Sequence, residues 1–103
     1  MGNDEFIIKK ILDYRTGESR QDGRPWANQE FILQRIEDTE YPDELLLRTR
    51  GERCVEWFGG LDPQFREGDK VKPSFSSRVT AFQTREGNVV YRQENTCWRL
   101  EKI

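Results

Sequence analysis

The chain has 103 residues, the usual size of one domain, and we expect a single domain over residues 1–103. It contains no histidine, which excludes the commonest general base near neutral pH and every serine–histidine or cysteine–histidine nucleophile pair. Its 17 basic and 19 acidic residues give a net charge of −2, which excludes the overall positive field of a strong non-specific DNA-binding protein.

The sequence also gives expectations about compartment and cofactors. No apolar run approaches the roughly 20 residues that span a bilayer, and the first residues, MGNDEFIIKK, carry acids where a secretory signal carries bases. We therefore expect a cytoplasmic protein with no membrane partner. Cys54 and Cys97 are too few for a paired-cysteine metal site, and no histidine can complete one. We expect two reduced, packed cysteines, no metal site and no cofactor.

The N-terminal part is predicted to be a strand followed by a long loop. Residues 5–14, EFIIKKILDY, are rich in isoleucine and fit a strand with one buried face and a bulge near Lys9 and Lys10. The polar stretch 15–25, RTGESRQDGRP, contains two glycines and a proline, which favour a loop over a tight two-residue turn.

Two further strands are predicted on either side of an acidic turn. In residues 26–36, Gln29, Phe31 and Leu33 alternate onto one face, which is the period of a strand. The acidic stretch that follows, EDTEYPDE, indicates a turn. Residues 44–50, ELLLRTR, fit a third strand, and their three consecutive leucines indicate burial on both sides near its middle.

One helix is predicted within residues 51–65, GERCVEWFGGLDPQF. Cys54, Phe58 and Leu61 have the i, i+4, i+7 spacing of a single apolar stripe on a helix. The two glycines after Phe58 and the later proline are expected to end it.

The C-terminal part is predicted to be a hairpin of two long strands. In residues 69–82, Val71, Phe75 and Val79 fall on one face, and Pro73 indicates that this part lies at an edge or a bend. Gly87-Asn88 is the expected turn into a fifth strand that runs to the C-terminus.

These elements follow one another as three strands, a short helix and two strands. That order predicts an all-β fold, a five-stranded Greek-key barrel of the OB type with the helix between the third and fourth strands. The alternative is a five-stranded open sheet or an SH3-like barrel, in which residues 52–58 would be loop.

Several segments carry a resemblance to a known family. They are GRPWANQEFILQ, the later YP, the helix region from Gly51, EGDKVKPSFSSR and the closing CWRLEKI. Over roughly residues 5 to 103 the chain resembles an uncharacterised bacterial family of single OB domains, which is similar to single-stranded-DNA-binding proteins and to the primosomal replication protein. The resemblance implies a binding fold without catalysis. The chain differs from the family pattern at Arg50, where an aromatic residue is usual, and in its longer last hairpin.

Arginine and aromatic side chains concentrate where an OB barrel binds its ligands, across strands two and three and in the loops joining strands one to two and four to five. Aromatic faces stack on bases, and guanidinium groups both stack and bind phosphate. The predicted nucleic-acid-binding residues are Arg15, Arg20, Arg24, Trp26, Arg35, Arg48, Arg50, Arg85, Tyr91 and Arg92.

Each candidate group also has a purely structural explanation. Trp26 either caps the core or stays exposed, whereas Trp57, Phe58, Phe75 and Trp98 fall at apolar spacing and are expected in the core. The arginines alternatively form a salt-bridged surface with the many acids. Glu37, Asp38, Glu40, Asp43 and Glu44 lack the alternating order of a calcium loop, so we expect a solvated turn there.

The first hypothesis is therefore binding of single-stranded DNA, or else RNA, with bases stacked on Trp26 and Tyr91 and phosphates bound by Arg24, Arg48 and Arg50. The alternative is a protein-interaction module that pairs an exposed strand edge or hairpin with a partner or with a second copy in a homodimer. No GxxxxGK[ST], GxGxxG or GxSxG motif occurs. Without these motifs and without histidine, a pair of converging carboxylates is the one catalytic option that remains. We therefore expect no enzymatic activity.

Overall fold

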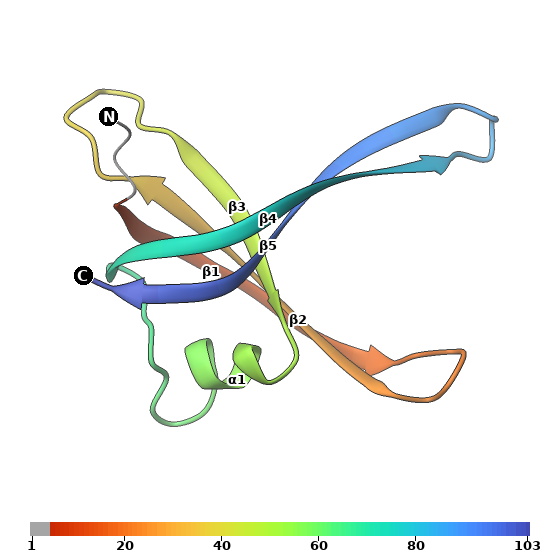
Figure 1. Cartoon of the computed structure of the whole chain (residues 1–103), viewed down its shortest axis with the longest axis horizontal. Coiled ribbons are helices and arrows are strands. Elements are labelled where there is room, and N and C mark those ends of the chain that lie inside the picture. The colour runs from red at the N-terminus through yellow and green to blue at the C-terminus, as the bar shows by residue number, and fades with distance from the viewer. Residues whose placement is uncertain (1–4) are drawn as a thin grey trace.

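The structure is a computed structural model that describes residues 5–103, so Met1–Asp4, which belong to the acidic N-terminal stretch, lie outside the described residues. The strands and helix follow the predicted order (Figure 1). They are β1 (Phe6–Glu18), β2 (Pro25–Arg35), β3 (Glu44–Arg50), α1 (Glu52–Phe58), β4 (Lys70–Gln83) and β5 (Val89–Lys102). The predicted all-β class with one short helix is confirmed. Within residues 5–103, no helix has the length and apolar character needed to cross a bilayer.

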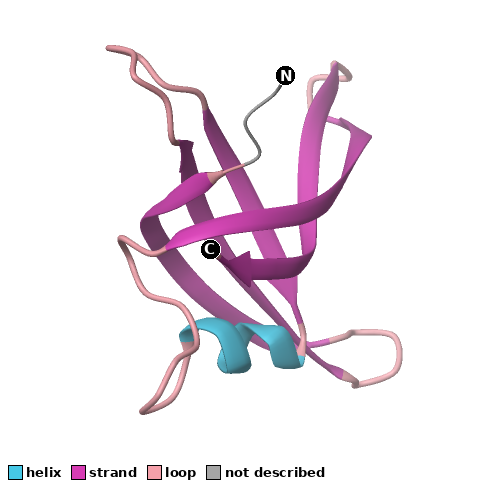
Figure 2. Cartoon of the chain, turned by 60° about the vertical axis from the view of Figure 1, so that its left-hand side comes forward, coloured by secondary structure: helices cyan, strands magenta, loops and turns pink. Residues whose placement is uncertain are grey.

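The five strands form one closed sheet in the order β1-β2-β3-β5-β4. Antiparallel ladders join β1 to β2, β2 to β3 and β4 to β5. The two remaining seams are short: β1 pairs with β4 at Phe6 and Ile7, and β3 pairs in parallel with β5 at Arg48. Figure 2 shows α1 lying across one end of the strands.

The core lies inside this closed sheet and under α1. Gln29, Phe31 and Leu33 of β2 are all buried, which confirms the predicted alternation. Trp57 of α1 is buried as predicted, and the ring of Phe58 lies 4.9 Å from that of Phe31. The helix therefore closes one end of the barrel with aromatic contacts.

The first hairpin is longer than the sequence predicts. The expected bulge near Lys9 and Lys10 is confirmed by a register shift between Ile8 and Lys10. The prediction of a loop over residues 15–25 is wrong, however. β1 continues to Glu18 and pairs with β2, which leaves only residues 19–24 as a turn. Ladder hydrogen bonds to β2 hold this polar stretch in a strand despite its composition.

The second hairpin departs from the predicted burial. Phe75 is 37% exposed and Trp98 is 50% exposed, so the prediction that both belong to the core is wrong. A register shift between Ser74 and Phe75 interrupts the β4–β5 ladder, so the simple alternation assumed from sequence does not hold across it. Beyond this point the two strands leave the barrel as a two-stranded arm (Figure 1).

Three smaller expectations are also wrong. Leu46 is 51% exposed, because it faces outward between the inward-facing Leu45 and Leu47 and the sheet is covered on one side only. Leu61 is fully exposed, because α1 ends at Phe58. The β4–β5 turn lies over 84–87 rather than at Gly87-Asn88: the Gly87 amide donates to the Thr84 carbonyl at 3.0 Å, with Gly87 at φ 87°.

Both cysteines are free and buried, as expected. The Cys97 thiol donates to the Arg99 carbonyl at 3.2 Å, and burial raises its pKa to about 11. Burial also raises the pKa of Cys54. A raised pKa keeps a thiol protonated and unreactive. We predict that a thiol reagent at slightly alkaline pH labels neither cysteine in the folded protein and labels both in urea; rapid labelling without urea would contradict this packing.

Candidate nucleic-acid interface

The candidate site is the outward face of β1, β2, β3 and β5. Residues opposite each other in an antiparallel pair share a face of the sheet. Asn28 pairs with Arg50 and Glu30 with Arg48, and all four alternate with the buried residues of β2 and β3. We call this surface the outer wall; it consists of Arg15, Trp26, Asn28, Glu30, Arg48, Arg50, Glu94, Thr96 and Trp98.

Two half-exposed tryptophans lie on either side of Arg50. Trp26 is 43% exposed and lines a hollow with Asn28 and Arg50. Trp98, at 50%, lines a second hollow that also includes Arg50. Of the two explanations considered for Trp26, the structure shows the exposed one. The outer wall thus presents two aromatic surfaces with a guanidinium between them.

Gly17 determines where the Trp26 ring lies. Gly17 pairs with Trp26 across β1 and β2, and a Cβ atom added to Gly17 would lie 2.6 Å from the Trp26 ring. Only a residue without a side chain permits so close an approach. The glycine therefore lets the indole rest against β1 at the base of the first hairpin.

Arg48 is already paired. Its Nη2 lies 2.7 Å from Oε2 of Glu94, and the two side chains are 21% and 26% exposed. Its Nε is buried and has no hydrogen-bond partner among the described residues. Because this pair joins β3 to β5 beside their single bridge, Arg48 is held in the wall and its charge is largely neutralised before any ligand binds.

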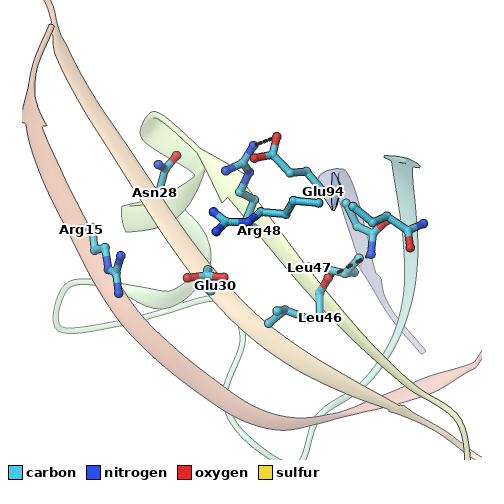
Figure 3. Close-up of a pocket in the computed structure, with 10 residues that line it drawn as sticks. Arg15, Asn28, Glu30, Leu46, Leu47, Arg48 and Glu94 are labelled. Atoms are coloured by element: carbon cyan, nitrogen blue, oxygen red, sulfur yellow. Dashed lines mark hydrogen bonds and ion pairs between the residues drawn. The ribbon is translucent and has the colours of Figure 1, made fainter. Parts of the chain in front are cut away.

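A pocket of about 440 Å³ opens between the outer wall and the base of the β4–β5 arm. Figure 3 shows Asn28 and Glu30 on β2, Arg15 beside them on β1, and the Arg48–Glu94 pair across the pocket. Asn95 donates its side-chain amide to the Leu46 carbonyl at 3.2 Å and so ties the arm to β3. The remaining lining residues are Leu46, Leu47, Arg92 and Gln93.

The structure brings five of the predicted site residues to this region and places three others at hairpin tips. Arg15, Trp26, Arg48, Arg50 and Arg92 line the wall or its hollows. Arg20 and Arg24 lie in the turn after β1, where Arg24 is 3.5 Å from Asp22, and Arg85 lies in the turn after β4. Both hairpins project from the barrel in different directions, so these tips lie away from the barrel (Figure 1).

Two predicted residues lie elsewhere. Arg35 is at the opposite end of β2, where its Nε is 3.2 Å from Glu37 and its guanidinium lies over Phe6 at 4.9 Å. Tyr91 is exposed, but it neighbours Arg92 on β5 and so points to the other face of the arm. Neither side chain joins the outer wall.

Sequence reasoning missed Trp98 and Arg78. Arg78 pairs with Glu94 across the arm and lines the same hollow as Trp98. Trp98 turns outward because of a bulge in the β4–β5 ladder, and the composition of the sequence does not reveal that bulge. The spacing placed Arg78 on the strand face opposite Val71, Phe75 and Val79, but nothing in the sequence placed that face beside Trp98.

The acidic turn lies at the far end of β2 and β3 from Trp26 (Figure 1). Asp43 is 3.7 Å from Arg35, and Glu44 pairs with Lys9 at 2.9 Å. Among residues 5–103, no group of three or more acids, cysteines or histidines is arranged to hold a metal ion. The acids therefore do not border the tryptophan end of the wall.

The sequence matches no known protein family, and no curated protein shows significant similarity to it. The family resemblance described above stays a prediction.

Proposed function

We propose that this chain is a non-enzymatic OB-type Greek-key barrel that binds single-stranded DNA along its outer wall. The closed order β1-β2-β3-β5-β4, with α1 between β3 and β4, supports the OB assignment. OB barrels bind oligonucleotides on the face of their second and third strands and in the 1–2 and 4–5 loops. The outer wall and the two projecting hairpins occupy these positions.

The observation that carries the proposal is Arg50 between Trp26 and Trp98. Binding of a single strand requires flat faces for bases and cations for phosphates, and each stacked base contributes about 1–3 kcal/mol. In residues 5–103, no carboxylate lies within ion-pair distance of Arg50. Its guanidinium is therefore ready to bind a phosphate.

The distribution of charge on the protein also favours binding of DNA at the end of the outer wall that carries Trp26. The protein is acidic overall, with a net charge of −2. Its acidic turn lies at one end of β2 and β3, whereas Arg20, Arg24 and Arg50 lie toward the other. Phosphates are attracted to the arginine-rich end and repelled from the acidic end. The bound single-stranded DNA is therefore expected to cross the outer wall beside Trp26.

Quenching of tryptophan fluorescence tests the proposal directly. Stacking of bases on Trp26 and Trp98 should quench their emission when oligo-dT is added at low salt, while buried Trp57 supplies a constant background. Added salt should restore the emission, because binding to phosphates releases counterions. Absence of quenching at micromolar protein in low salt would remove the proposal.

We predict that Arg50→Ala weakens binding to every oligonucleotide by a similar factor. The fall of log affinity with log salt concentration should become less steep by about 1. The reason is the loss of one phosphate contact. The measurement is oligo-dT titration at several salt concentrations. Arg66→Ala is the matched control, because Arg66 is an exposed residue between α1 and β4 and its replacement changes the net charge equally. Equal salt slopes for the two variants would show that Arg50 makes no such contact.

Self-association or partner binding through the β4–β5 arm is the second candidate. Val79 and Tyr91 are 65% and 71% exposed on the arm, and β4 pairs with β1 only at its first two residues, which leaves its edge open beyond Val71. Open strand edges bind other strands. Light scattering separates the candidates: a dimer that ignores oligo-dT supports the second, and a monomer that binds it supports the first.

A further inference from the structure

The pocket beside the arm contains a carboxylate that the proposed function does not use. Glu30 lies on β2 opposite Arg48, on the surface that also presents Arg15, Arg50 and Arg92. No basic nitrogen among the described residues lies within ion-pair distance of its carboxylate. Its partial burial also removes part of the water that an isolated charge would keep. Such a carboxylate weakens phosphate binding at this point.

Repulsion between like charges decides which part of a bound strand lies over Glu30. A phosphate placed there would meet a carboxylate at short range in a partly desolvated pocket, which is unfavourable. A base carries no charge and presents hydrogen-bonding groups at its edge. The part of the strand that enters the pocket is therefore a base, with its phosphates directed toward the arginines around the rim.

An ionised carboxylate accepts hydrogen bonds and donates none, so the base it binds best offers two adjacent donors. Guanine has N1–H and N2–H₂ side by side. Thymine has a single N–H between two carbonyl oxygens, and cytosine and adenine each place an amino group beside an acceptor nitrogen. The carboxylate would repel those acceptors. Of the four DNA bases, guanine alone fits both carboxylate oxygens at once.

The other lining groups complement the rest of a guanine. Arg15 and Asn28 line the same pocket and carry N–H donors, which suit the guanine O6 and N7 acceptors. Leu46 is half-exposed at the pocket and offers an apolar contact for the ring. Glu94 is held by Arg48 at 2.7 Å, which leaves Glu30 as the pocket carboxylate without an ion pair (Figure 3).

We propose that this pocket selects guanine from a bound single strand of DNA, with the Glu30 carboxylate accepting hydrogen bonds from guanine N1–H and N2–H₂. This inference rests on the proposed function, because a strand must first bind the outer wall. It adds base preference to a surface that stacking alone would leave tolerant of sequence.

The test compares oligo-dT with the same oligonucleotide carrying one central guanine. The guanine should strengthen binding by roughly tenfold, the discrimination of one good bidentate contact. In Glu30→Gln the amide presents a donor in place of one acceptor, so the preference should fall to about onefold, and oligo-dT should bind more tightly because a charge that repels phosphate is lost. Replacing the guanine with hypoxanthine, which lacks the N2 amino group, should remove much of the preference in the parent protein.

The control variant is Glu40→Gln, which makes the same change of charge at an exposed position in the acidic turn, away from the outer wall and both projecting hairpins, and should leave the preference intact. Equal affinity of the parent for the two oligonucleotides, or a preference that survives Glu30→Gln, would overturn the guanine assignment while single-strand binding stands. Failure of both oligonucleotides to bind would overturn the proposed function itself, and the guanine assignment with it.

Discussion

Replacing both Trp26 and Trp98 with alanine should weaken oligo-dT binding by about a thousandfold and leave the fold intact. If each indole stacks on one base and contributes about 2 kcal/mol, the two together contribute about 4 kcal/mol. Both side chains are about half-exposed and neither belongs to the buried core, so their removal opens no cavity. Because this variant has lost the fluorescent reporters, the measurement is the anisotropy of a labelled oligo-dT.

The single variants show whether the two indoles act independently. Trp26 and Trp98 line different hollows that share Arg50. We therefore expect each single substitution to lower the affinity for oligo-dT by about thirtyfold, and the two losses of binding free energy to add. Tyr41→Ala is the control, because Tyr41 is an exposed aromatic in the acidic turn, away from the outer wall. A double variant that binds as tightly as the Tyr41→Ala protein would exclude stacking on this surface.

The barrel could be predicted from sequence where alternation is regular. Gln29, Phe31 and Leu33 show a period of two, and each is buried in the structure. The helix was predictable from Cys54 and Phe58, whose spacing fits one face of a helix that ends at two glycines, although Leu61 of the same predicted stripe lies beyond that end. Such local patterns report directly on which side of an element is buried. The closure of the sheet was inferred only from the order of the elements, and its short seams leave no local pattern.

The candidate site was harder to predict, because a strand's outward face depends on its register. The arginines of the middle strands and Trp26 were predicted from their place in the element order. Trp98 was assigned to the core, since a bulge that shifts register has no reliable signature in composition. Arg35 was predicted to belong to the binding site but lies outside it. It is on β2 as expected, but at the acidic end, where Glu37 and Asp43 pair with it.

The same geometry explains why binding and stability should separate in this protein. The outer wall consists of side chains that alternate with the core residues of β2 and β3, so each strand has one face for each role. Substitutions on the wall change binding without opening the core. Substitutions on the inner face should instead affect the closure of the barrel.

Phe31→Ala should therefore cost about 3–5 kcal/mol of folding stability, the usual result of removing a buried phenylalanine. Phe31 is fully buried, pairs with Ile11 of β1 and Leu47 of β3, and packs its ring against that of Phe58 of α1 at a tilt of 49°. Domains of this kind have about 5–15 kcal/mol of stability in total, so this loss is a large share.

Urea unfolding followed by Trp57 fluorescence measures this loss, because Trp57 is buried in the same core. The midpoint should fall at an unchanged slope, which indicates lower stability without a change in the surface exposed on unfolding. Leu46→Ala is the control, because Leu46 is half-exposed on the neighbouring strand, and its substitution should cost only a few tenths of a kcal/mol. Equal midpoints for the two variants would mean that the ring of Phe31 does not close the barrel against α1.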